Sequence, residues 1–251
     1  MQDLKISLIT VVYNAQNTIE RCIKSVVGQQ FLNLEYIVID GGSTDGTINI
    51  IKKYRDNVTV FISEPDKGIY DAMNKGIAQA TGDVIGTLNA DDYLFDNEVL
   101  NNIGSIFTEH NIDILYGDLD YVDIEGKIKR KWRSGKYKED MFNWGWMPPH
   151  PTFYCKRELF EKFGSYSLNY GSAADYELMS RFIHLHKIKP YYLDIVMVVM
   201  IVGGISNKSI VNRVRALRFD LKAMRNNNIM IPQMAVLLKP MRKMVQFFKN
   251  K

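Results

Sequence analysis

Residues 84–92 read Val84-Ile85-Gly86-Thr87-Leu88-Asn89-Ala90-Asp91-Asp92, an apolar run that passes directly into a small acidic cluster. The run predicts a buried strand, so the cluster is expected at the rim of a sheet. Paired carboxylates at such a rim are good ligands for a hard divalent cation, Mg²⁺ or Mn²⁺. A cation held there can in turn bind a diphosphate. The alternative is a polar loop that caps the next helix, and this stretch alone leaves both open.

Strand-like and helix-like segments alternate on the N-terminal side of this stretch. Strands are expected at residues 5–12, 35–39, 58–62 and 84–88, with helices at 17–28, 47–54 and 69–80 between them. This alternation predicts an α/β fold, with a mostly parallel sheet flanked by helices on both faces. Ligands of such open sheets bind beyond the carboxyl ends of the strands, which is where the acidic cluster lies.

The C-terminal side is organised differently. Its expected elements are a helix at 97–110, a hairpin of two strands within 112–131, an aromatic and proline-rich loop at 144–151, helices at 156–163 and 175–186, and a buried strand at 195–202. Beyond residue 205 the chain becomes helical and basic. We therefore expect one domain over residues 1–205, with halves at about 1–110 and 111–205, and a basic amphipathic helical tail over 206–251.

The composition limits the class of protein. A chain of 251 residues with 46% hydrophobic and 24% charged residues fits a globular α/β domain. The net charge of +4 implies no general affinity for nucleic acid. Two distant cysteines suggest neither a zinc site nor a disulfide framework, and with no signal peptide evident a cytoplasmic location is expected. No G-x-G-x-x-G follows any predicted strand, which argues against a nicotinamide enzyme.

Asp40 ends the second predicted strand and is followed by two glycines. A carboxylate at this position can accept the N–H of a uracil ring while backbone N–H groups meet the ring carbonyls. Gly41 favours a close approach of the backbone to such a ligand. The alternative is that Asp40 caps the turn that follows it.

Asp71, Asn74 and Lys75 share one face of the helix expected at 69–80, because residues three and four apart are neighbours on a helix. They lie either near the ribose and diphosphate of a nucleotide or on a solvated face with a weak ion pair.

Two further candidates lie in the second half. Asp175 stands in the first turn of a predicted helix, where it fits a capping box with Ser172. The helix dipole there also favours an ionised carboxylate, which suits a general base. His150, in the stiff loop, is either a surface residue or a contact to a metal, a diphosphate or a sugar hydroxyl. Gly203-Gly204 is either a phosphate-binding turn or a strand terminator.

Together these motifs resemble the family 2 glycosyltransferases of bacterial O-antigen and exopolysaccharide synthesis. The resemblance covers about residues 4–205, and five motifs in order are far more specific than any one of them. The matching stretches are Ser7-Leu8-Ile9-Thr10-Val11-Val12-Tyr13-Asn14, Ile39-Asp40-Gly41-Gly42-Ser43-Thr44-Asp45-Gly46-Thr47, Ser63-Glu64-Pro65-Asp66-Lys67-Gly68-Ile69-Tyr70-Asp71-Ala72-Met73-Asn74-Lys75-Gly76, Leu88-Asn89-Ala90-Asp91-Asp92 and Ala174-Asp175-Tyr176-Glu177-Leu178.

The resemblance implies a GT-A fold, with a nucleotide-sugar-binding half over 1–110 and an acceptor-binding half over 111–205. It implies inverting transfer from a nucleotide-diphosphate sugar, most often UDP-linked, with Mn²⁺ or Mg²⁺. The implied roles are nucleotide contact for Thr10, Tyr13 and Asn14, base contact for Asp40 and Gly41, ribose or diphosphate contact for Asp71 and Asn74, donor contact for Asn89, Ala90 and Asp91, metal binding for Asp91 and Asp92, and general base for Asp175.

The chain departs from the family pattern at two positions. Asn89 stands where the first aspartate of the D-x-D motif is usual, and it offers a carbonyl oxygen without charge. Ala174 stands where many relatives carry an acid, so Asp175 must act alone as the base.

The composition of the C-terminal tail indicates a membrane surface as the partner. Residues 231–251 carry five lysine and arginine residues and no acid, mixed with bulky apolar side chains. This pattern is typical of a helix on an anionic membrane surface, and the alternative is a helix packed on the domain or on a dimer partner. A peripheral position on the inner face of a bacterial plasma membrane suits an acceptor saccharide on polyprenyl diphosphate. The preceding basic segment could bind that diphosphate through Arg213, Arg215, Arg218, Lys222 and Arg225.

Two other classes stay open at this point. A sugar-nucleotidyltransferase shares the acids at the strand ends, but it would need a glycine-rich basic loop near the N-terminus. The other class is a non-catalytic nucleotide-sugar binder or membrane scaffold.

Overall fold

The computed structural model describes the backbone of residues 4–202 and 210–248, and the side chains of residues 4–202 and 214–242. The strands in these ranges are β1 (Ile6–Val12), β2 (Leu34–Asp40), β3 (Val60–Ser63), β4 (Val84–Asn89), β5 (Tyr93–Leu94), β6 (Ile114–Val122), β7 (Ile128–Trp132), β8 (Tyr154–Lys156) and β9 (Tyr191–Ile201). The α-helices are α1 (Ile19–Val27), α2 (Thr47–Lys52), α3 (Ile69–Gln79), α4 (Val99–Glu109), α5 (Arg157–Phe163), α6 (Ala174–Ser180), α7 (Ile210–Asn226) and α8 (Pro232–Phe248).

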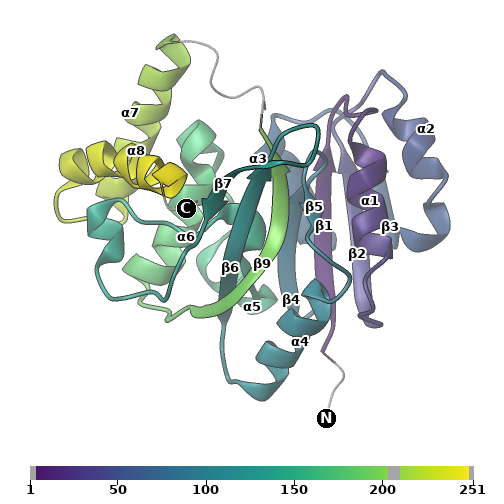
Figure 1. Ribbon diagram of the computed structural model, residues 1–251, viewed down its shortest axis with the longest axis horizontal. Helices are drawn as coiled ribbons and strands as arrows, with labels where there is room; N and C mark the ends of the chain where they lie inside the picture. The colour runs from purple at the N-terminus through teal and green to yellow at the C-terminus, as the bar shows by residue number, and fades with distance from the viewer. Residues whose placement is uncertain (1–3, 203–209, 249–251) are drawn as a thin grey trace.

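The described strands form a sheet in the order β3-β2-β1-β4-β8-β6-β9-β5, with β7 paired to β6 (Figure 1). Strands β1 to β4 are parallel, as their alternation with helices predicts. Strand β8 is antiparallel to both β4 and β6, so β6 points the same way as β4, and β9 is parallel to β6. The mostly parallel α/β architecture is therefore confirmed. The carboxyl ends of the long strands meet at one edge of the sheet.

Helices cover both faces of this sheet, and for that reason β1 is buried along its whole length. Alternate residues of β1 enter two different cores: Leu8 packs with Ile23 of α1, whereas Ile9 packs with Met73 of α3. Helix α3 lies very close to the sheet because Gly76 carries no side chain, and a Cβ at that position would collide with Ile9.

Two short strands and one helix end differ from the prediction. Strands β5 and β8 have two and three residues, too few to produce a detectable alternation in sequence. The helix expected at 175–186 is α6, which begins at Ala174 and continues as a π-helical turn over Arg181–Leu185. The hairpin within 112–131 is present as β6 and β7.

The C-terminal helices pack on the second half of the preceding chain, residues 111–202, and share its core. Met224 and Val236 are buried in the same cluster as Phe142 and Tyr176. Helix α8 approaches so closely that a Cβ at Gly145 would lie 2.6 Å from the Ala235 carbonyl oxygen. The boundary at residue 205 therefore does not separate two cores. Gly203-Gly204 lies outside the described residues, and in the described part of the chain no helix has the length and apolarity to span a bilayer.

Candidate functional site

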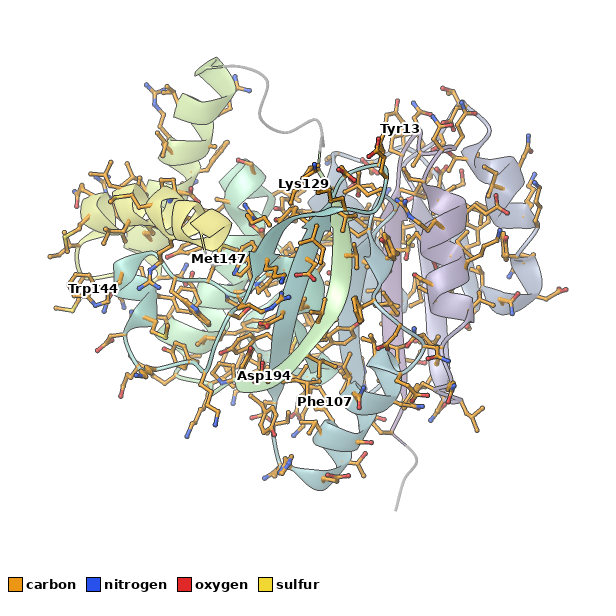
Figure 2. All side chains as sticks on the ribbon, viewed as in Figure 1. Tyr13, Phe107, Lys129, Trp144, Met147 and Asp194 are labelled. Atoms are coloured by element: carbon orange, nitrogen blue, oxygen red, sulfur yellow. The ribbon has the colours of Figure 1, made fainter. Side chains whose placement is uncertain are left out.

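The register of the sheet assembles polar residues at its carboxyl edge. Val12 pairs with Asp40 and Val11 with Asn89, so the ends of β1, β2 and β4 lie side by side. Figure 2 shows Tyr13 beyond the end of β1 at this edge, with 63% of its surface exposed. An exposed aromatic ring beside buried polar side chains gives a stacking surface for a planar ligand.

Asn14 joins two loops of this edge. Its backbone is left-handed, with φ 48°, a conformation that asparagine tolerates better than most residues. Its N–H donates to Ser43 Oγ at 2.8 Å, and its Oδ1 accepts the Thr44 N–H at 2.9 Å. Asn14 therefore fixes the loop after β1 against the loop after β2 beside Tyr13.

Asp40 caps its own turn and still has an unpaired oxygen. Its side chain is fully buried, and Oδ2 accepts the N–H of Gly42 at 3.2 Å, the N–H of Ser43 at 3.0 Å and the Ser63 hydroxyl at 2.6 Å. Oδ1 is buried without a hydrogen-bond partner. The two alternatives for Asp40 are thus compatible, because Oδ2 holds the turn and leaves Oδ1 without a hydrogen bond.

Gly41 separates the Asp40 turn from a second carboxylate. A Cβ at this position would collide with the Asp66 carboxylate, and the nearest atom of Tyr13 would lie 3.5 Å away. Asp66 therefore lies directly beside the Asp40 turn, a contact between two strand ends that depends on the tertiary fold.

The two aspartates of the acidic cluster have different environments. Asp91 is exposed, whereas Asp92 is 1% exposed and its Oδ2 accepts an Asn89 Nδ2–H at 3.0 Å. Burial, followed by the charge of Asp91, raises the pKa of Asp92 well above its usual range. Asn89 Oδ1 and Asp92 Oδ1 are both buried without a partner. Ala90 is buried and donates its N–H to the Val11 carbonyl at 3.3 Å, which fixes the cluster to β1.

This donor set fits a hard divalent cation. It consists of oxygen atoms, of which the exposed Asp91 carboxylate is accessible and two more are unpartnered. In the described ranges no group of three or more His, Cys, Asp and Glu residues could by itself hold a metal ion. Mg²⁺ and Mn²⁺ sites of nucleotide enzymes commonly use one or two carboxylates and complete the shell with phosphates and water.

Two arginine–tyrosine pairs lie near the cluster, and sequence reasoning did not identify them. Arg21 of α1 donates to the Asp91 carbonyl at 3.4 Å and lies over the Tyr93 ring at 4.7 Å. On the other side, the Arg130 guanidinium stacks on Tyr121 at 3.8 Å. The charge of Asp92 contributes to raising the pKa of Tyr121, after the larger effect of burial. Cross-strand pairing of β6 with β7 creates this neighbourhood, and no spacing rule along the chain reveals it.

Three predicted nucleotide contacts have other partners. Thr10 is completely buried and accepts the Tyr36 hydroxyl at 3.1 Å on the core side of β1, so its hydroxyl is used inside the fold, and its contact with a nucleotide stays a prediction. Asp71 accepts the Lys67 N–H at 3.0 Å. Its Oδ2 lies 3.9 Å from Lys75 Nζ, the weak ion pair of the alternative reading. The Asn74 side-chain amide bonds the backbone of Tyr166, 92 positions along the chain.

Asp175 is half-buried at the start of α6. Its Oδ1 accepts the N–H of the next residue, Tyr176, at 2.7 Å. The N-cap of α6 is Ala173 and has no side-chain capping bond, so the capping box with Ser172 is not formed. The alternative in which Asp175 only caps a helix is therefore not supported.

His150 is 9% exposed, so its alternative as a surface residue is wrong. Its Nε2 lies 2.7 Å from the Tyr166 hydroxyl. Burial lowers the pKa of His150, and the negative charge of Asp175 acts in the opposite direction. The stiff loop thus places His150 within electrostatic range of Asp175.

Comparisons with known proteins agree with these features. A family profile described as "Glycosyl transferase family 2" matches residues 7–168. A PGL/p-HBAD biosynthesis glycosyltransferase of Mycobacterium tuberculosis is 29% identical over 206 residues, which span 80% of this chain and 78% of that protein. An uncharacterized glycosyltransferase of the same species is 33% identical over 188 residues, 70% of this chain and 68% of that protein.

Solved structures share the fold. S. aureus TarS 1-349 in complex with UDP has a TM-score of 0.71 at 20% identity, over 98% of this chain and 74% of that chain. Against a longer TarS chain the TM-score is 0.68, and the match spans 92% of this chain but 41% of that one. The mannosyltransferase PcManGT from Pyrobaculum calidifontis, in complex with GDP-Man and Mn²⁺, has a TM-score of 0.66 at 15% identity, over 98% of this chain and 76% of that chain. These likenesses show the GT-A fold.

Proposed function

Because the chain belongs to glycosyltransferase family 2, we propose that it is an inverting enzyme that transfers a sugar from a UDP-linked donor to a saccharide on a lipid diphosphate. The pathway we propose is bacterial surface polysaccharide assembly, of O-antigen or exopolysaccharide. One observation supports this function above all: Tyr70 stands in the first turn of α3, the helix that follows the carboxyl end of β3, and Asp175 lies within electrostatic range of it.

The donor half supplies groups suited to a uridine diphosphate. The exposed ring of Tyr13 offers a stacking surface, and the free Oδ1 of Asp40 can accept the N–H of uracil. Asp91, with the unpartnered oxygens of Asn89 and Asp92 behind it, would hold Mn²⁺ or Mg²⁺. The bound cation would supply neutralising charge to the diphosphate leaving group. The UDP of the TarS complex and the Mn²⁺ of the PcManGT complex are consistent with this assignment.

The acceptor half supplies the base. In a single in-line displacement an acceptor hydroxyl attacks the anomeric carbon as the bond to the diphosphate breaks. The oxygen–carbon bond forms on the opposite face, which inverts the configuration, and the hydroxyl proton passes to the Asp175 carboxylate. Ala174 brings no second acid, so Asp175 takes this proton alone. General-base catalysis of this kind contributes roughly 10²–10⁴ in rate.

The C-terminal helices would bring the enzyme to the lipid. Large apolar side chains are exposed around α8, with Leu237 at 67%, Met241 at 57% and Trp144 at 51%. Figure 2 shows Trp144 on the flank of the molecule beside α8, and Arg242 Nε donates to its carbonyl at 2.8 Å. Apolar side chains among basic ones suit the surface of an anionic bilayer, where the enzyme would be peripheral and on the cytoplasmic side.

The membrane contact is tested with Leu237→Glu and Met241→Glu. We expect both variants to lose binding to vesicles of phosphatidylglycerol and phosphatidylcholine in flotation. Leu32→Glu, at a side chain that is 98% exposed in the donor half, is the matched control and should bind as the wild type does. Equal flotation of all four proteins would contradict the membrane contact.

The reaction is tested with a panel of UDP- and GDP-linked sugars and a polyprenyl-diphosphate GlcNAc or GalNAc acceptor, read by product mass. We expect one UDP-linked donor to add a single sugar of inverted configuration in the presence of Mn²⁺ or Mg²⁺. Nucleotide-sugar binding without transfer to any acceptor would favour the non-catalytic alternative. Formation of a nucleotide sugar from a sugar phosphate would instead favour the nucleotidyltransferase.

A further inference from the structure

Helix α3 of the donor half is tied to the acceptor half through one amide side chain. Asn74 Nδ2 donates to the Tyr166 carbonyl at 2.8 Å, and Asn74 Oδ1 accepts the Tyr166 N–H at 2.9 Å. Both sides of the amide are therefore used on the backbone of a residue 92 positions away. Two converging bonds fix the position of Tyr166 more tightly than either bond alone, because they restrict rotation as well as distance.

Tyr166 lies between Tyr70 and His150. Its ring packs on the Tyr70 ring with centroids 5.5 Å apart and planes tilted by 34°. Its hydroxyl lies 2.7 Å from His150 Nε2, and the two rings meet edge to face at 5.6 Å. Tyr166 and His150 are 5% and 9% exposed, so water has little access to this bond. A buried hydrogen bond between packed rings holds both side chains in one geometry.

Tyr70 in turn meets Asp175. Tyr70 lies close enough to Asp175 for the charge of that carboxylate to act on its phenol. Burial raises the pKa of Tyr70 strongly and the charge of Asp175 raises it further, so the phenol keeps its proton at neutral pH and can donate it in a hydrogen bond. Since Asp175 Oδ1 already accepts the Tyr176 N–H, a second donor restricts the rotation of the carboxylate.

We propose that Tyr70 is a positioning residue for the Asp175 carboxylate, and that Asn74, Tyr166 and His150 hold Tyr70 in place. The inference rests on the proposed role of Asp175 as the base. It gives the stretch Tyr70-Asp71-Ala72-Met73-Asn74 a role on the acceptor side, although it begins a helix of the donor half. One turn of α3 would thereby fix the position of the base relative to a donor bound at the same edge of the sheet. A misplacement of about 1 Å in such a group costs on the order of 10²-fold in rate.

Tyr70→Phe removes the hydroxyl and keeps the ring. We expect kcat, measured with the donor–acceptor pair that reacts in the panel, to fall about 10- to 100-fold, with KM for the donor and binding of UDP unchanged. The kcat–pH profile of the variant should differ from that of the wild type, a change that a loss of folded protein alone would not produce. The titratable side chains facing Asp175 in this cluster are Tyr70, Tyr166 and His150.

His150 gives a test by rescue. His150→Ala should lower kcat in the same way as Tyr70→Phe. His150→Gln can still bond the Tyr166 hydroxyl, so its kcat should be much closer to that of the wild type. The matched control is Tyr54→Phe, which loses a hydroxyl bonded to Glu20 Oε1 at 2.8 Å on α1, and it should keep the wild-type kcat and pH profile.

The outcomes separate this inference from the proposed function. If Asp175→Asn is inactive but Tyr70→Phe has the wild-type kcat and pH profile, the positioning role is wrong and the base stands. If Asp175→Asn turns over normally, the base assignment itself fails. Should Tyr70→Phe not fold, Tyr166→Phe carries the test, because Asn74 bonds the backbone of residue 166; a wild-type profile in that variant overturns the proposal, and a lowered kcat with unchanged donor KM supports it.

Discussion

The donor edge and the acceptor-side helix α6 hold their carboxylates in opposite ways. Asp40 and Asp92 are buried and bonded to partners within three residues of themselves, apart from the Ser63 hydroxyl on the neighbouring strand. Asp175 is half-buried, and the cluster beside it is held by bonds between residues 16 and 92 positions apart. The buried carboxylates of the proposed donor edge are thus held mainly by local turns, whereas the residues around Asp175 are held by long-range bonds. Changes in the donor edge should affect ligand binding, whereas changes around Asp175 should affect turnover.

The largest effect is expected for Asp91→Ala. Because Asp91 is the accessible carboxylate of the acidic cluster, its loss should abolish cation-dependent binding of UDP and all turnover. Isothermal titration with UDP in the presence and absence of Mn²⁺ measures this. Asp56→Ala, another exposed carboxylate, is the control and should bind as the wild type does. If the affinity of Asp91→Ala for UDP still depends on Mn²⁺, the cation does not bind at this edge.

A smaller effect, on stability, is expected for Asn74→Ala. The N–H and carbonyl of Tyr166 both lose their partner, which should lower the free energy of unfolding by about 2 kcal/mol. Asn74→Asp keeps the acceptor and should lose less. Urea unfolding measures the stability of both variants. An unchanged midpoint in Asn74→Ala would mean that this amide contributes nothing to the free energy of unfolding.

The smallest effect concerns Glu35, at the amino-terminal edge of the sheet, and it varies with pH. Burial alone would raise the pKa of Glu35, but hydrogen bonds from Ser7, Thr81 and Lys5 outweigh it and lower the pKa to about 2, from 4.5. A depressed carboxyl pKa stabilises the fold above the unfolded value, and this contribution is lost as the pH falls from about 4.5 to about 2.

Glu35→Gln should therefore be less stable than the wild type at pH 7, and its unfolding free energy should vary less between pH 4.5 and 2. Urea unfolding at a series of pH values gives both curves. Curves that run parallel through this window would show that the carboxylate of Glu35 contributes nothing to the pH dependence.

The same contrast explains what the sequence could predict. The parallel strands and the polar residues at their ends follow from local alternation, and the family resemblance followed from five such motifs. The docking of α7 and α8, the short strands β5 and β8, and the partners of Asn74 depend on residues far apart in the chain. The burial of Thr10 against Tyr36 could not be predicted, because position in a motif does not tell which face of a strand a side chain occupies. His150 could be recognised as held in a stiff loop, but its burial against Tyr166 could not.

The central claim is that donor binding and proton removal reside in separate parts of one site, and Asp175→Asn tests it most directly. Titration with UDP and Mn²⁺ and product formation should be measured on the same preparation of this variant. We predict an unchanged Kd for UDP together with a turnover lowered by about 10²–10⁴. Normal turnover, or loss of UDP binding in parallel with turnover, would contradict the account.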